Sequence, residues 1–269
     1  MEGKTIGLFF LMVSKNHVDI FGTKVSITNI NLAPQQVIGL CEKKSTGYIC
    51  LPDAYVIVAA AKNLRLRQIL NQSLLTLPDG APLVLYAKSK GIKNIGTVSG
   101  YWLVKKLMDT HLTHYFYGSS PGELAKIKAN LENEFPHARI LGYKSPPWVS
   151  PNEIETNSQI ADDMEQIKLL GPNIVWVGLN SPKQDYLMKA YAPLLGNIVL
   201  IGIGGVYDYL SGTMKISPEW VKKLSLRWVY RIIQNPRRLF RKTFIAIFGF
   251  SLLTLKEFVS VRKKAPADV

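Results

Sequence analysis

The residues of this sequence that could do chemistry come directly after short apolar runs. Such runs are typical of the strands of a parallel sheet, and ligands of parallel sheets bind beyond the carboxyl ends of the strands. The polar residues and glycines in these positions are Asp53, Asp79, Gly80, Gly118, Lys183, Gln184, Gly202, Gly204, Gly205 and Asp208. Amide and ammonium groups hold phosphates and sugar hydroxyls, and glycines let backbone N–H groups approach an anion, so we expect a binding site here.

Asp79 lies in the turn Pro78-Asp79-Gly80, which follows the apolar run Leu74–Leu77. The structural interpretation is a turn aspartate that bonds its own backbone. The functional interpretation is a general base, because a sugar hydroxyl must lose its proton as it attacks an anomeric carbon. The spacing alone leaves both interpretations open.

Two further motifs point to anion binding, each beside a plain structural alternative. Gly202-Ile203-Gly204-Gly205 follows a strand-like run but lacks the third glycine of a dinucleotide fingerprint, so a tight turn explains it equally well. Ser181-Pro182-Lys183-Gln184-Asp185 follows the most apolar run and also suits the first turn of a helix. No Asp-x-Asp follows a strand and the four histidines lack ligand spacing, so we expect no metal. Lysine, arginine and backbone amides would then neutralise a diphosphate.

The composition indicates a globular protein with an anionic partner. Its 269 residues suffice for one large or two small domains, and an apolar content of 47% excludes a disordered chain. Lysine and arginine number 33 against 19 aspartates and glutamates. The net charge of +14 favours nucleic acid, an anionic membrane or a phosphorylated substrate as the partner. The two cysteines form no disulfide framework and fit a reducing compartment.

Hydropathy gives no membrane-spanning segment. No apolar run approaches the roughly 20 residues of a spanning helix, and the longest candidate is 244–255. The stretch 6–13 has the length of a signal-peptide core, but one lysine precedes it and no small-residue cleavage site follows. We interpret it as an N-terminal strand or a short apolar lead and expect the chain to stay in the cytoplasm.

From about residue 45 onward, short apolar runs alternate with helical patterns. The expected strands are Tyr48–Leu51, Leu74–Leu77, Tyr115–Tyr117, Arg139–Tyr143, Ile174–Leu179 and Ile198–Ile203. Helical spacing begins near Ala54, Glu123 and Glu153. The alternation predicts an α/β fold over residues 1–215: a Rossmann-like core with a parallel sheet and helices on both faces.

Residues 216–269 are predicted to form a basic helical appendage. Lysines and arginines crowd the segment 218–264, where the only acidic residues are Glu219 and Glu257. Tryptophans, phenylalanines and leucines are interleaved with them, which is the pattern of an interfacial helix on anionic lipid. Nucleic-acid binding is the rival hypothesis. The apolar run 244–255 suits lipid better than a phosphate backbone.

Five segments in order resemble the WecG/TagA/CpsF family of bacterial glycosyltransferases, glycosyltransferase family 26. They are LPDGAPLV (77–84), YGSSPGELAKIKANLENEFPHARILGYKSPPW (117–148), PNIVWVGLNSPKQD (172–185), IGIGGVYDYLSGTMKISPEW (201–220) and RWVYRIIQNPRRLFRKTF (227–244). The resemblance spans about residues 20 to 244.

This resemblance implies inverting, metal-independent transfer of a sugar, usually N-acetylmannosamine, from a UDP-sugar to N-acetylglucosamine linked to undecaprenyl diphosphate. It implies no cofactor, a peripheral position on the cytoplasmic face of the bacterial membrane, and a role in cell-surface polysaccharide or teichoic acid synthesis. The family's proposed base falls on Asp79, and the glutamine of its P-K-Q-E motif falls on Gln184, with Asp185 replacing the glutamate. The arginines thought to hold the diphosphate fall among Arg231, Arg237, Arg238 and Arg241. A homo-oligomer is compatible with the sequence.

The sequence departs from the family pattern at several positions. Leu51-Pro52-Asp53 replaces a Thr-x-Asn, Thr97 and Trp102 replace an arginine and an acid, and Arg227 replaces a glutamate. These positions are expected near the donor sugar, so a different hexose or a weakened enzyme stays open. The hypotheses are therefore a glycosyltransferase, a non-catalytic module of the same fold that binds a nucleotide-sugar or the membrane, and a basic nucleic-acid binder.

Overall fold

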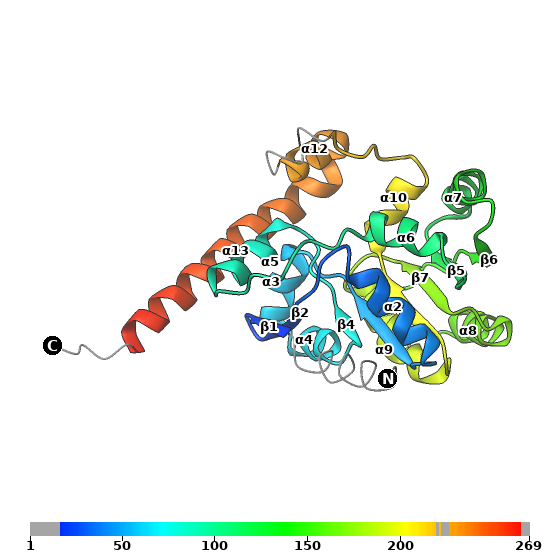
Figure 1. Ribbon diagram of the computed structural model, residues 1–269, viewed down its shortest axis with the longest axis horizontal. Coiled ribbons are helices and arrows are strands. Elements are labelled where there is room, and N and C mark those ends of the chain that lie inside the picture. Colours follow the sequence, from blue (N-terminus) through cyan, green and yellow to red (C-terminus); the bar gives the residue numbers. More distant parts are fainter. Residues whose placement is uncertain (1–16, 219–220, 222–225, 265–269) are drawn as a thin grey trace, which may run out of the picture.

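A computed structural model describes residues 17–218, 221 and 226–264 of the chain (Figure 1). The strand expected at 6–13 lies outside these residues. The side chains of 227, 228, 238 and 260–264 are also outside the description. Within the described ranges, no helix combines the length and the apolar character needed to cross a membrane.

Six parallel strands form the central sheet, which confirms the predicted α/β fold. They are β3 (Gly47–Cys50), β4 (Leu75–Thr76), β5 (Thr113–Gly118), β6 (Arg139–Lys144), β7 (Ile174–Gly178) and β8 (Val199–Gly202). Their spatial order is β4-β3-β8-β7-β5-β6. The strands β7 and β8 are buried at every residue, which is why both read as continuous apolar runs.

Helices cover both faces of this sheet. One face packs against α2 (Ala33–Glu42), α6 (Gly100–Met108), α7 (Pro121–Glu134) and α10 (Tyr207–Leu210). The other packs against α4 (Leu64–Asn71), α8 (Ser158–Leu170), α9 (Lys183–Tyr191) and part of α3 (Ala54–Lys62). Short 3-10 turns, η1 (Ala192–Leu194) and η2 (Gly204–Val206), flank β8. Alternate residues of β3, β5, β7 and β8 therefore enter two separate hydrophobic cores, as the period of two requires.

A third core lies beside the sheet and anchors the C-terminal helices. It joins the antiparallel hairpin of β1 (His17–Ile20) and β2 (Thr23–Ser26) to α3, α5 (Ala81–Ser89) and Phe250. Phe250 belongs to α13 (Pro236–Lys264), which follows α12 (Arg227–Gln234). Where α13 crosses α3, a Cβ at Gly249 would lie 2.7 Å from Val58, so the two helices meet closely because this residue is glycine. The end of α13 then projects away from the sheet (Figure 1).

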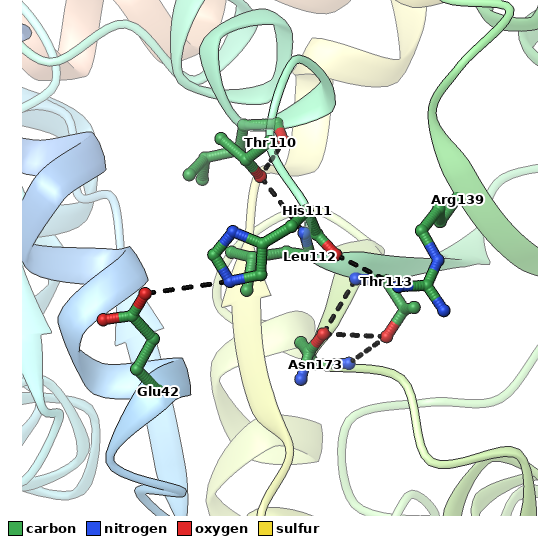
Figure 2. Close-up of polar contacts among 8 residues, drawn as sticks. Glu42, Thr110, His111, Leu112, Thr113, Arg139 and Asn173 are labelled. Carbon is green, nitrogen blue, oxygen red and sulfur yellow. Dashed lines mark hydrogen bonds and ion pairs between the residues drawn. The ribbon is translucent and has the colours of Figure 1, made fainter.

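A polar network ties the strands together at their amino ends (Figure 2). The Asn173 side-chain oxygen, just before β7, accepts bonds from the Thr113 backbone N–H at 2.8 Å and hydroxyl at 2.9 Å. The Thr113 hydroxyl in turn accepts the Asn173 backbone N–H at 2.9 Å. Because these bonds fix the register of β5 and β7, Gly118 and Gly178 pair at the opposite edge of the sheet. This is the edge that carries the site candidates.

Candidate active site

A cavity of about 480 Å³ lies at the carboxyl ends of β3, β4, β7 and β8. The chain leaves β3 toward α3 on one face of the sheet and leaves β8 toward α10 on the other. These connections diverge between the neighbouring strands β3 and β8, and such a switch point is where ligands of open α/β sheets bind. Residues of α12 and α13 complete the wall, so the C-terminal helices belong to the site as much as the sheet does.

Three carboxylates line this cavity. Asp79 and Gly80 follow β4, and the Asp79 backbone N–H donates to the Pro52 carbonyl at 3.2 Å. Gly80 has φ of +105°, a conformation that favours glycine, so the backbone of this turn explains why glycine occupies the position. Asp53 caps α3 by accepting the Val56 N–H at 3.0 Å, and Asp208 enters from α10. Within the described part of the chain, no three His, Cys, Asp or Glu side chains are grouped so as to hold a metal ion.

Arg231 supplies the positive charge of the cavity. Burial by itself lowers the pKa of its guanidinium, but Tyr209 and the carboxylates of Asp79, Asp53 and Asp208 outweigh burial and hold the pKa above its ordinary value. Its Nε has no hydrogen-bond partner among the described residues. A charged, planar donor with unused hydrogen-bonding capacity is therefore held beside the acidic residues, as recognition of a phosphate group requires.

Gln184 lies between the two ends of the glycine turn. Its side chain is 3% exposed and lines the cavity. A Cβ at Gly202 would lie 2.9 Å from Gln184 Nε2, and one at Gly204 would lie 3.1 Å from Oε1. Both glycines therefore make room for this amide, and Gly204 and Gly205 also line the cavity.

Other predicted site residues lie elsewhere. Gly118, Gly202, Lys183, Arg237 and Arg241 do not line the cavity, and the Arg238 side chain is outside the described residues. A Cβ at Gly118 would lie 2.6 Å from the Gly178 carbonyl oxygen, so this glycine permits the close pairing of β5 with β7. Lys183 Nζ lies 5.6 Å from the centre of the Trp148 ring, outside the cavity. Arg237 and Arg241 are exposed on α13.

The structure also brings aromatic residues and a second cation into the cavity, and of these the sequence had pointed only to Trp102. Tyr101 and Trp102 at the start of α6 and Tyr209 of α10 form an aromatic wall. The ring centre of Tyr101 lies 5.3 Å from that of Trp102 and 6.2 Å from that of Tyr209. Lys242 of α13 adds a second cation, 5.4 Å from the centre of the Tyr55 ring. Trp102 was expected near the donor sugar because it departs from a family motif, whereas no spacing signal pointed to Tyr101, Tyr209 or Lys242.

Comparisons with known proteins give a family and two relatives for the chain. A family model described as "Glycosyl transferase WecG/TagA/CpsF family" matches residues 18–264. The N-acetylglucosaminyldiphosphoundecaprenol N-acetyl-beta-D-mannosaminyltransferase of Bacillus subtilis (strain 168) is 28% identical over 220 residues, which cover 80% of this chain and 82% of that protein. The protein of the same name from Bacillus spizizenii (strain ATCC 23059 / NRRL B-14472 / W23) is 29% identical over 183 residues, which cover 66% of this chain and 68% of that protein.

Proposed function

The chain belongs to the glycosyl transferase WecG/TagA/CpsF family, and we propose that it moves a sugar from a UDP-sugar to a sugar linked to undecaprenyl diphosphate. The relatives named above support a lipid-linked acceptor of this kind. The observation that carries the proposal is the presence of Asp79 and Arg231 in the wall of one cavity at the switch point of the sheet, where the carboxylate influences the guanidinium electrostatically. A carboxylate there can take a proton, and a guanidinium can neutralise a departing diphosphate.

The transfer is a single displacement. Asp79 accepts the proton of an acceptor hydroxyl as its oxygen bonds to the anomeric carbon of the donor sugar. The bond from that carbon to the diphosphate oxygen breaks, and UDP leaves with the bonding electron pair. Arg231 and Lys242 stabilise the negative charge that develops on the diphosphate, which makes a metal ion unnecessary. Attack opposite the leaving group inverts the anomeric configuration.

A donor panel tests this function. Purified protein is incubated with UDP-hexoses, UDP-N-acetylhexosamines and a short-chain polyprenyl-diphosphate sugar, with and without EDTA, and released UDP is measured. We expect acceptor-dependent UDP release with one class of donor, at a rate that EDTA leaves unchanged. Absence of UDP with every donor would instead support a non-catalytic module of the same fold, and inhibition by EDTA would refute the metal-independent chemistry.

We further propose that residues 216–269 form an appendage that places the cavity at an anionic membrane, on its cytoplasmic face. Residues of helix α13, among them Leu239, Thr243 and Ala246, line the cavity. Apolar side chains recur along the same helix at helical spacing and are exposed: Phe240, Phe244, Phe248, Leu252, Leu255 and Phe258. Exposed aromatic side chains on a basic helix are typical of interfacial binding, so the reacting groups would meet a lipid-linked acceptor at the surface.

Replacing Phe244 and Phe248 by aspartate is expected to weaken binding to vesicles of anionic lipid by at least about 100-fold, because burial of each ring contributes roughly 1.5–3 kcal/mol. Vesicle sedimentation measures the loss. The matched control is Leu169→Asp on α8, a residue that is 86% exposed but remote from α13, and it should sediment as the wild type does. Equal sedimentation of all three proteins would contradict the membrane role, and retention by oligonucleotides would favour the nucleic-acid alternative.

A further inference from the structure

The cavity has an apolar section that the transfer chemistry does not use. It is lined by apolar residues of α3, α5 and α13, namely Ala54, Ala81, Pro82, Ala246, Ile247 and Phe250. Ala54 and Phe250 also belong to the third core, and Ala246 packs against that core. The apolar section is therefore an uncovered side of a hydrophobic core. Sugars and diphosphates are polar and gain little by displacing water from such a wall, so a different part of a substrate has to account for it.

One face of α13 forms the long wall of this section. From Lys242 onward, the cavity-lining residues of the helix come in adjacent pairs, one pair per turn: Lys242, Thr243, Ala246, Ile247, Phe250 and Ser251. Such spacing places side chains on a single face of a helix. Ile247 is 40% exposed and Ser251 is also exposed, so the section opens to the surface at this end. Each of these two follows an exposed phenylalanine, Phe244 or Phe248, by three residues, so the opening adjoins the aromatic face that is proposed to meet the membrane.

Two cations lie where the polar part of the cavity meets the apolar section. Arg231 interacts electrostatically with the carboxylates of the cavity, and Lys242 precedes Ala246 by one turn on the lining face of α13. Lys242 Nζ lies 5.4 Å from the centre of the Tyr55 ring, and Tyr55 directly follows Ala54. The cavity thus passes from carboxylates to cations to an apolar wall. A polyprenyl-diphosphate sugar has the matching order of a polar sugar, an anionic diphosphate and a hydrocarbon chain.

We propose that the apolar section binds the first isoprene units of the acceptor's polyprenyl chain, so that the protein itself, and not the bilayer alone, holds the hydrocarbon next to the diphosphate. This inference rests on the proposed function and gives the acceptor chain a site of its own. From Lys242 to Ser251 the helix rises roughly 14 Å, which is room for about two or three extended isoprene units. Because a UDP-sugar has no hydrocarbon chain, the section distinguishes the acceptor from the donor although both carry a diphosphate.

Titration calorimetry of the full chain with dimethylallyl, geranyl and farnesyl diphosphate, without vesicles or detergent, tests this inference. The three probes differ only by successive isoprene units. We expect the wild-type affinity to rise roughly tenfold with each added unit, because burial of about two of its carbons is enough for that factor. Ala246→Phe fills the section and Ile247→Asn places a neutral amide in it. Each variant should bind geranyl and farnesyl diphosphate at least about tenfold more weakly than the wild type does.

The matched control is Ile233→Asn, the same exchange at a residue of α12 that is 71% exposed and does not line the cavity. It should keep the wild-type affinity for all three probes. If Ala246→Phe does not fold, Ile247→Asn alone decides, since its position is already partly exposed.

A wild-type affinity that does not rise from dimethylallyl to farnesyl diphosphate, or wild-type affinities in the folded variants, would overturn the inference. Acceptor-dependent UDP release would then still support the proposed function. Binding of short-chain phosphatidylglycerol as tightly as farnesyl diphosphate would assign the section to membrane lipid and overturn the inference as well. A rise with chain length in a protein that releases UDP from no donor would support the chain site and overturn the proposed function.

Discussion

Replacement of Asp79 by asparagine is expected to lower the rate of sugar transfer by a factor of about 10² to 10⁴. Asparagine has nearly the same shape, so the turn that joins β4 to Gly80 and the backbone bond to Pro52 should remain. The amide cannot accept a proton at neutral pH, so the acceptor hydroxyl would attack without its general base. The change should therefore appear in kcat, while calorimetry should find UDP-sugar binding within about threefold of the wild type, less than one hydrogen bond is worth.

Asp109→Asn is the control for this substitution. Asp109 ends α6 and is exposed, and it does not line the cavity. The control should keep the wild-type kcat and melting temperature. If Asp79→Asn turned over at the wild-type rate with its fold intact, another group would have to be the base, and the two remaining carboxylates of the cavity, Asp53 and Asp208, would be the next to replace.

Replacement of Arg231 by methionine should have the second large effect, a loss of about 10² to 10³ in kcat/KM, as for other groups that stabilise developing negative charge. Methionine preserves much of the apolar volume but removes the guanidinium. Three carboxylates would then face an incoming diphosphate without this cation. Arg231→Lys should recover only part of the activity, because an ammonium cannot form the bidentate bonds of a guanidinium. Steady-state kinetics over a range of donor concentrations measures both variants.

Arg237→Met provides the comparison, since this arginine is exposed on α13 and does not line the cavity. Its kcat/KM with a detergent-soluble acceptor should fall far less than that of Arg231→Met. Equal losses would mean that Arg237 contributes as much as Arg231 and would contradict the assignment of the diphosphate to the cavity arginine. The pair of variants thus separates two of the arginines among which the sequence could not choose.

The parallel sheet was predictable because its strands carry a signal that does not depend on the rest of the fold. β7 and β8 are covered on both sides, so each shows as an unbroken apolar run, and the run expected at 174–179 became Ile174–Gly178. The hairpin of β1 and β2 gave no such signal. It has four-residue strands with one buried side, and its place is set by contacts with α3, α5 and Phe250, which are distant in sequence.

The candidate site likewise contains residues that the sequence could place and residues that it could not. Asp53 and Asp79 lie just after strands, and Gln184 lies in the first turn of the helix that follows β7, so the topology alone carries them to one end of the sheet. Tyr209 and Lys242 lie within helices, and a helix brings a residue to a cavity only through its packing angle. The orientation of α13 depends on its close crossing of α3 at Gly249, and nothing in the local sequence specifies that crossing.

The most direct measurement of the proposed activity is the mass of the lipid-linked product. Purified protein, a UDP-sugar from the donor panel and a short-chain polyprenyl-diphosphate sugar are combined, and product and UDP are quantified together. We expect an acceptor heavier by one sugar residue, formed in equal amount with UDP, and at least about 100-fold less of it in the same time with Asp79→Asn. UDP release without a heavier acceptor, or an equal yield from Asp79→Asn, would contradict sugar transfer at this cavity.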